Sequence, residues 1–213
     1  MEDSFRHKGL RKKLAEEVKK KGIKDERIIN AINTIPRHLF MDSSFVNFAY
    51  KDKAFPIGAG QTISQPYTVA FQTELLQVNK NEKILEIGTG SGYQAAVLME
   101  LGAKVYTIER QRDLFLKSQS LLNKLGYHPR FFYGDGFKGV GAFSPYDKII
   151  ITAGAGEIPN ELLKQLKTGG RMVIPIGNND HQEMLLVEKK DENKYEQSKH
   201  GWFAFVPLLK GTE

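Results

Sequence analysis

Three closely spaced glycines mark the part of this chain best suited to binding a small ligand. Residues 85–92 read Leu-Glu-Ile-Gly-Thr-Gly-Ser-Gly and form the end of an apolar run. We interpret them as a buried strand that turns sharply into a helix, because glycine permits the backbone angles of such a turn and lets a ligand approach the main chain. The amides at the start of that helix would then face a bound anionic group.

The spacing of the glycines and the acid before them narrow the choice of ligand. The pattern is G-x-G-x-G, tighter than the G-x-G-x-x-G fingerprint that serves a dinucleotide pyrophosphate. Glu86 stands two residues before the first glycine. A carboxylate there suits a cationic group such as an amino-acid ammonium, which S-adenosylmethionine carries and NAD does not. We therefore expect this cofactor to bind at Glu86, Gly88, Thr89, Gly90, Ser91 and Gly92.

Two further acids follow the next two predicted strands. Glu109 stands 21 residues after Gly88, the usual place for an acid that binds ribose hydroxyls. Without the glycine loop upstream, it would be interpreted as an exposed acid starting a helix. Asp135 lies between two glycines, so an adenine contact and a plain turn both stay open. Small residues at 152–156, after the fourth strand, leave room for a substrate.

The elements that must position these residues alternate from residue 83 onward. Apolar runs predict strands at 83–87, 104–109, 130–133, 147–152 and 171–176, and the segments between them predict helices at 92–101, 111–125 and 159–167. Gly102 and Gly126 are typical helix C-terminal glycines. We expect an α/β fold with a doubly wound, mostly parallel, Rossmann-like sheet. Segments 182–189 and 195–206 predict an antiparallel hairpin at one sheet edge.

The residues before this region predict a helical cap. Leu10, Leu14 and Val18 recur at four-residue spacing and give a first helix its buried stripe. A second helix is expected from about Asp25 to Pro36, which stops it.

An aromatic loop and a third helix are expected next. Residues 37–60 have the composition of a loop, and Ser64 has the residue type of a helix cap, with Pro66 in the first turn. We expect a single catalytic domain over residues 1–213, with a cap at 1–80 that contributes to the substrate cleft and a binding core at 81–213.

Composition excludes several kinds of chemistry. The chain has 213 residues and no cysteine, which excludes disulfides, thiolate metal sites and cytosine methylation through a thiolate adduct. No apolar run approaches the roughly 18 residues of a membrane span. The first 13 residues are charged and lack the apolar centre of a signal peptide. We expect a cytoplasmic protein without a membrane partner.

The positive charge is concentrated at the N-terminus. Residues 1–24 hold nine Lys or Arg and four acids, so +5 of the net charge of +6 lies there. A nucleic-acid enzyme would be expected to carry its positive charge around the active site. We interpret the basic segment as the solvated face of the first helix, and we expect no nucleic-acid partner.

A series of motifs, in the right order from about residue 28 to 209, resembles the protein-L-isoaspartate O-methyltransferase family. They are Ile35-Pro36-Arg37-His38-Leu39-Phe40, Gly60-Gln61-Thr62-Ile63-Ser64-Gln65-Pro66-Tyr67, the run from Leu85 to Tyr93, Tyr133-Gly134-Asp135-Gly136, Gly169-Gly170-Arg171, Ile174-Pro175-Ile176-Gly177 and Phe205-Val206-Pro207-Leu208. Many methyltransferases share the glycine loop. The stretch around Ser64 is far more specific, because it lies outside the cofactor fold.

The resemblance implies a repair activity and a set of site residues. The family transfers a methyl group from S-adenosylmethionine, leaving S-adenosylhomocysteine, to the α-carboxylate of L-isoaspartyl residues in damaged proteins or peptides. The ester closes to a succinimide, part of which reopens as normal aspartate. The family's active-site serine falls on Ser64. The cofactor residues fall on Thr62, Ile63, Ser64, the glycine loop, Glu109 with its neighbour Arg110, Asp135 and Gly136.

Two departures from the family pattern concern substrate contacts. This chain has Gly154-Ala155-Gly156 where the family often has a proline, and Leu209 where some members have a polar residue. Neither touches the glycine loop.

The residue types suit a carboxylate acceptor. A carboxylate with a pKa of about 4 is ionised at neutral pH, so no general base or metal is required. His7, His38, His128, His181 and His200 show no ligand spacing. We hypothesise that the Ser64 hydroxyl holds a carboxylate oxygen; the alternative is that Ser64 only caps a helix.

Three alternatives stay open from the sequence. The aromatic residues Phe40, Phe45, Phe48 and Tyr50 either form one wall of the cleft or pack the cap on the sheet. The enzyme could instead methylate nucleic acid or another substrate, although the Asn/Asp-Pro-Pro-aromatic motif that grips a flipped base is absent after the fourth strand. A non-catalytic S-adenosylmethionine-binding protein is the third alternative. We expect a monomer.

Overall fold

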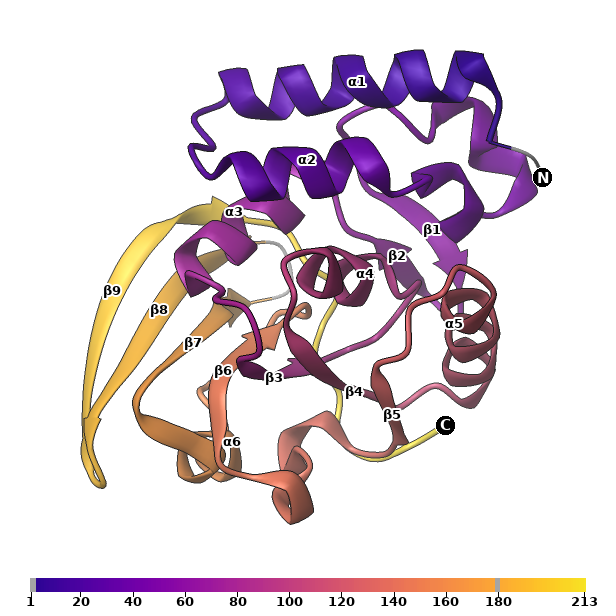
Figure 1. Cartoon of the computed structure of the whole chain (residues 1–213). Coiled ribbons are helices and arrows are strands. Elements are labelled where there is room, and N and C mark those ends of the chain that lie inside the picture. The colour runs from indigo at the N-terminus through magenta and orange to yellow at the C-terminus, as the bar shows by residue number, and fades with distance from the viewer. Residues whose placement is uncertain (1–2, 179–180) are drawn as a thin grey trace.

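The computed structural model describes residues 3–178 and 181–213, and the described strands form the predicted mixed sheet (Figure 1). The sheet order is β5-β4-β3-β6-β7-β8-β9. Its strands are β3 (Lys83–Ile87), β4 (Lys104–Glu109), β5 (Arg130–Tyr133), β6 (Tyr146–Ile151), β7 (Leu166–Asn178), β8 (His181–Asp191) and β9 (Lys194–Phe203). The first five pair in parallel, and β8 and β9 are antiparallel. The predicted fold class is confirmed.

Helices cover both faces of the sheet. They are α1 (Phe5–Lys20), α2 (Glu26–Thr34), α3 (Pro66–Leu76), α4 (Tyr93–Glu100), α5 (Arg112–Lys124) and α6 (Asn160–Gln165). Helices α3, α4 and α5 share one apolar cluster with the sheet, and α1 and α2 form an outer layer on that side (Figure 1). Helix α6 packs into a second cluster on the opposite face.

Local chemistry sets several helix ends as predicted. Asp25 caps α2, and the extended Ile35 before Pro36 ends it. Gly102 and Gly126 follow α4 and α5 with φ of 83° and 82°, the left-handed conformation that lets a helix stop. None of the helices among the described residues is both long and apolar enough to cross a membrane.

Residues 37–60 are more ordered than the predicted loop. They contain two short 3-10 helices, Arg37–Phe40 and Ser43–Phe48, and the strand β1 (Phe55–Gly58). β1 pairs with β2 (Gln61–Ile63) to form a small antiparallel sheet. Elements this short carry no measurable periodicity, so the sequence did not reveal them.

Ser64 does not cap α3, which corrects that prediction. The N-cap residue is Gln65, and its side chain makes no capping bond. A distant carboxylate replaces the cap: Asp52 Oδ1 accepts from the Tyr67 amide at 2.8 Å. The Ser64 side chain is therefore not needed to start the helix.

Candidate functional site

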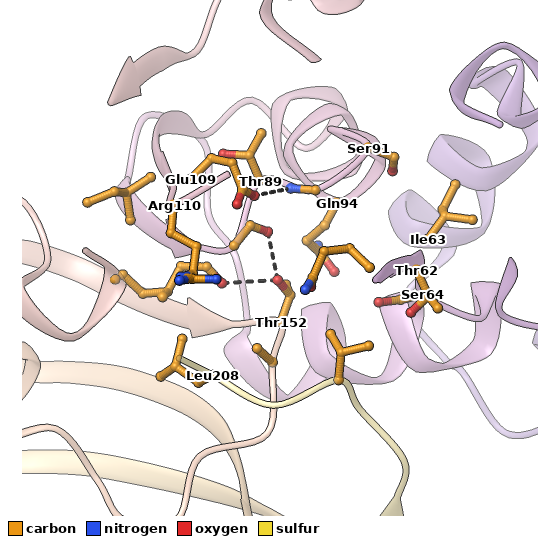
Figure 2. A pocket seen from close by; sticks show the side chains of 18 of the residues that line it. Thr62, Ile63, Ser64, Thr89, Ser91, Gln94, Glu109, Arg110, Thr152 and Leu208 are labelled. Atoms are coloured by element: carbon orange, nitrogen blue, oxygen red, sulfur yellow. Dashed lines mark hydrogen bonds between the residues drawn. The ribbon is translucent and has the colours of Figure 1, made fainter. Parts of the chain in front are cut away.

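A cavity of about 740 Å³ opens at the carboxyl ends of the parallel strands (Figure 2). We call it the loop cavity, because the glycine loop forms its floor. Glu109 and Arg110 lie on one side of it and Thr62, Ile63 and Ser64 on the other (Figure 2). It is lined by Gln61, Thr62, Ile63, Ser64, Val69, Ile87, Gly88, Thr89, Gly90, Ser91, Tyr93, Gln94, Ile108, Glu109, Arg110, Gly136, Thr152, Ala153, Val206, Pro207, Leu208 and Leu209.

The glycine loop is held tightly against the next strands. Gly88 has φ of 92°, and a Cβ there would lie 2.7 Å from Thr152 Oγ1. The Thr152 hydroxyl donates to the Gly88 carbonyl at 2.7 Å. Gly92, at φ 87°, is the N-cap of α4. The loop thus turns as predicted, and only glycine fits at its first position.

Glu109 fixes the loop and faces the cavity. Its Oε2 accepts from the Gly90 amide at 2.8 Å, and its Oε1 accepts from the Gln111 amide at 2.9 Å. The residue is buried and lines the cavity. Because each carboxylate oxygen can accept two hydrogen bonds, both keep capacity for hydroxyl groups of a ligand.

Three buried polar atoms of lining residues lack partners within the described chain: Tyr93 Oη, Gln94 Oε1 and Arg110 Nη1. Gln94 donates to Thr73 Oγ1 at 2.9 Å, but its Oε1 has no donor. Arg110 bonds the Gly211 carbonyl and Glu213, while its Nη1 has no acceptor. Since buried polar groups are normally paired, these atoms indicate a polar ligand that supplies both a donor and an acceptor.

Glu86 does not line the loop cavity, which corrects its predicted role. Side chains alternate along a strand, so Glu86 points to the α4 side of β3, as Ile84 does. It is fully buried, and its Oε2 accepts from Thr107 Oγ1 at 2.6 Å. Burial raises the pKa of Glu86 to about 8. The carboxyl is therefore largely protonated at neutral pH, and it lies outside the lining of the loop cavity.

Two other predicted residues lie beside the cavity without lining it. Gly92 is turned toward Leu122, which a Cβ would meet at 2.8 Å. Asp135 uses both oxygens internally: Oδ1 accepts from the Phe137 amide at 2.9 Å and Oδ2 from the Gly211 amide at 3.0 Å. Asp135 caps a short turn, and its neighbour Gly136 lines the loop cavity; the adenine contact of Asp135 stays a prediction.

A second hollow adjoins the first on the Ser64 side. We call it the aromatic cavity; it measures about 1130 Å³ and includes open solvent. Thr62, Ser64, Thr152 and Val206 line both cavities. Its remaining lining residues are Ala54, Gln65, Tyr67, Thr68, His181, Trp202, Phe203, Ala204 and Phe205.

Three aromatic residues that line the aromatic cavity, Trp202, Phe203 and Phe205, come from the C-terminal part of the chain and not from residues 37–60. None of Phe40, Phe45, Phe48 and Tyr50 lines either cavity. Phe40 is buried and packs edge-on against Tyr93, with ring centroids 5.5 Å apart. The packing alternative describes Phe40, and Phe45 and Tyr50 are partly buried against the same core, whereas Phe48 is exposed.

The histidines depart in two places from the scattered distribution that the sequence predicted. His181 lies on the rim of the aromatic cavity. The stacked rings of His7 and His38 lie beside Asp3, close enough for the three to share an ion. Both Asp3 oxygens accept from Arg11, at 3.0 and 3.1 Å. None of these three residues lines either cavity.

Sequence reasoning missed lining residues that come from distant segments. Val206 and Leu208 reach the loop cavity because the chain after β9 passes over it, with Gly154 and Leu208 joined by a 2.7 Å backbone bond. Gln94 had a usable signal, since it is the second residue of the helix that follows the loop.

The chain is similar to known proteins over nearly its whole length. The family model described as Protein-L-isoaspartate(D-aspartate) O-methyltransferase matches residues 9–213. Proteins named protein-L-isoaspartate O-methyltransferase from Christiangramia forsetii and Flavobacterium johnsoniae are 61% and 58% identical over 211 residues, covering 99% of each chain. A solved protein-L-isoaspartate O-methyltransferase is 33% identical with a TM-score of 0.84, over 92% of this chain and 65% of that one.

A second solved structure supports the fold alone. It is a putative protein-L-isoaspartate O-methyltransferase from Plasmodium falciparum, in complex with S-adenosyl-L-homocysteine. The two chains are 22% identical with a TM-score of 0.82, over 94% of this chain and 99% of that one.

Proposed function

The chain belongs to the protein-L-isoaspartate O-methyltransferase family, and we propose that its two adjoining cavities divide that family's reaction between them. The enzyme transfers a methyl group from S-adenosylmethionine to the α-carboxylate of L-isoaspartyl residues. The observation that carries the division is the shared lining: Thr62, Ser64, Thr152 and Val206 face both cavities. A donor in one cavity and an acceptor in the other would meet at these residues.

The residues of the loop cavity fit S-adenosylmethionine. Glu109 has acceptor capacity for ribose hydroxyls, and Gln94 Oε1 is an unpartnered acceptor that suits the ammonium group in place of Glu86. Arg110 Nη1 offers a donor on the same side as Glu109. We assign the remaining contacts to Thr62, Ile63, Ser64, Gly88, Thr89, Gly90, Ser91 and Gly136. When bound, S-adenosylmethionine supplies an electrophilic methyl group on a sulfonium.

The acceptor needs positioning rather than activation. A carboxylate with a pKa of about 4 is already a nucleophile at neutral pH. Ser64 stands at the junction of the cavities, and we assign its hydroxyl to hold one carboxylate oxygen so that the other faces the methyl group. A neutral donor suits this task, because a lysine there would pair with the anion and weaken it as a nucleophile. The chain's contribution is then alignment and exclusion of water.

The aromatic cavity suits a peptide better than a nucleic acid. Across both cavities Arg110 is the single Lys or Arg among the described lining residues. A phosphate backbone would instead need several cations along its path. Tyr67, Trp202 and Phe205 offer apolar surface for the chain on either side of an isoaspartyl residue.

Methyl transfer from labelled S-adenosylmethionine tests this function. Three acceptors are compared: an isoaspartyl peptide, its normal aspartyl twin and an RNA. We expect label in the isoaspartyl peptide alone. Label in the twin or in RNA, with none in the isoaspartyl peptide, would contradict the proposed substrate.

A further inference from the structure

We propose that Arg37 is a positioning residue for methyl transfer, because its buried guanidinium holds the main chain of Ser64 in place. This inference rests on the proposed function. Arg37 lines neither cavity, so it acts through the segment that carries Ser64 rather than on the substrate.

The Arg37 guanidinium joins three parts of the site. Its Nη2 donates to the Ser64 carbonyl at 2.9 Å and to the Lys53 carbonyl at 3.3 Å. Ala54, which follows Lys53, lines the aromatic cavity. The guanidinium also lies over the ring of Tyr93, 4.7 Å from its centroid, and Tyr93 lines the loop cavity. The Arg37 side chain thus connects lining segments of both cavities without lining either cavity itself.

The placement is energetically demanding, which argues for a role beyond filling space. Arg37 is fully buried, and no carboxylate of the described residues lies within salt-bridge distance. Its Nε and Nη1 have no hydrogen-bond acceptor in the described part of the chain. Burial lowers the pKa of Arg37 to about 10, so the side chain remains charged at neutral pH. A buried charge is expensive, and this one is compensated by two carbonyls, the ring of Tyr93 and the more distant charge of Asp52.

Asp52 holds the other side of the same segment. Its Oδ2 accepts from Gln65 Nε2 at 3.0 Å and its Oδ1 accepts from the Tyr67 amide. Ser64 therefore lies between a donor that fixes its own carbonyl and an acceptor that fixes the next residues. The Asp52 charge also favours the charged form of Arg37.

The mechanism of action is geometric. Ser64 lies between β2 and α3, outside regular secondary structure. The direction of its side chain therefore depends on how its backbone is held, and the bond from Arg37 to its carbonyl fixes that backbone. If the carbonyl were released, the hydroxyl would sample other directions, and misplacement by about 1 Å can lower a rate by about a hundredfold. Among the proposed cofactor contacts Arg37 bonds Ser64, whereas Glu109, Gln94 and the glycine loop make no hydrogen bond to Arg37 within the described chain.

The test uses the full chain with Arg37→Met, Arg37→Lys and Arg11→Met. Arg11 is the matched control: it is a buried arginine of the same cap that bonds Asp3 and the Asn33 carbonyl, away from Ser64. Measured quantities are kcat and KM for an isoaspartyl peptide, the affinity for S-adenosylhomocysteine, and the thermal midpoint. Activity is assayed well below every midpoint.

We expect kcat of Arg37→Met to fall by about tenfold to a hundredfold, with nearly unchanged S-adenosylhomocysteine affinity. The kcat of Arg37→Lys should lie between those of Arg37→Met and the original chain, because a lysine ammonium can donate to a carbonyl but lacks the planar, forked geometry of a guanidinium. Arg11→Met should lose stability and keep its kcat. If Arg37→Met does not fold, a lowered kcat of Arg37→Lys carries the test.

The original kcat in any folded Arg37 variant, or an equal loss of kcat in Arg11→Met, would overturn the inference. An absence of methyl transfer by the unaltered chain would instead overturn the proposed function, and this inference with it.

Discussion

At the scale of single residues, Ser64 and Glu86 show how well the type of a residue predicts whether it lines the site. Both carry polar side chains in motifs that the sequence singled out. Ser64 lines both cavities, whereas Glu86 faces α4. The difference follows from strand alternation: Glu86 lies on the same face of β3 as Ile84, whereas Ile87, the next residue of that strand, lines the loop cavity. For Glu86, the position of the residue along its strand, rather than the motif that contains it, decides whether the side chain reaches the loop cavity.

Replacing Ser64 by alanine should separate catalysis from stability. We expect kcat for the isoaspartyl peptide to fall by about a hundredfold, the cost of losing one preorganised donor. The free energy of unfolding should change by less than about 0.5 kcal/mol, because Ser64 does not cap α3. Urea unfolding and steady-state kinetics on the same preparation measure both. A loss of about 1 kcal/mol with full turnover would restore the capping interpretation.

Glu86 should make the stability of the chain depend on pH. Its pKa is about 4.5 in the unfolded chain and about 8 when folded, so between these values the folded state holds a proton that the unfolded state has released. The contribution of Glu86 to stability is therefore fully present below pH 4.5 and is lost as pH rises toward 8, by up to about 1.4 kcal/mol per pH unit. Glu86→Gln mimics the protonated form and should remove this slope. Urea unfolding at several pH values checks it; an identical slope in the variant would contradict the assignment.

At the scale of elements, periodic segments were predictable and short ones were not. The five parallel strands and the hairpin could be placed because apolar runs and helix-stopping glycines are local signals. β1, β2 and the two 3-10 helices carry at most six residues each, and their order depends on long-range contacts. Asp52 is an example: it starts α3 from 15 residues away in sequence.

Asp52→Asn should loosen the start of α3. The variant loses the negative charge beside a helix N-terminus and the ion pair with Lys21. We expect it to lower the free energy of unfolding by about 1–2 kcal/mol. Lys21→Met removes only the partly exposed partner and should cost less than about 1 kcal/mol.

Hydrogen exchange of the Tyr67 amide is the local readout. It should be faster in Asp52→Asn and unchanged in Lys21→Met. Equal stability losses in the two variants would show that the ion pair, rather than the replacement cap, carries the contribution of Asp52.

At the scale of the whole molecule, the site is assembled from the two ends of the sequence around a predictable centre. The glycine loop and Glu109 belong to the sheet, whereas Ser64 comes from the segment before it and Val206 from the segment after it. Contacts such as the Gly211 amide with Asp135 join residues 76 positions apart. No local pattern encodes such pairings, so the two cavities could be expected only in outline.

Ligand binding should stabilise the assembled chain. S-adenosylhomocysteine at about a hundred times its Kd should raise the free energy of unfolding by about 2.7 kcal/mol. Glu109→Gln should lose most of this stabilisation, because it weakens the bond to the Gly90 amide and removes a carboxylate oxygen that would accept from ligand hydroxyls. Glu161→Gln, which alters an exposed acid of α6 that pairs with Lys164 and lines neither cavity, serves as control and should keep it. If S-adenosylhomocysteine stabilised Glu109→Gln as much as the original chain, Glu109 would not contribute to ligand binding.

The most direct measurement of the central claim is the conversion of an isoaspartyl peptide into its aspartyl twin. Esterification of the α-carboxylate leads to a succinimide, which reopens partly as aspartate, so only methylation at that carboxylate produces the twin. Chromatographic quantification over repeated turnovers should show the twin accumulating with S-adenosylmethionine present, and far more slowly with Ser64→Ala. Methyl groups entering the peptide while the twin fails to accumulate would contradict the account.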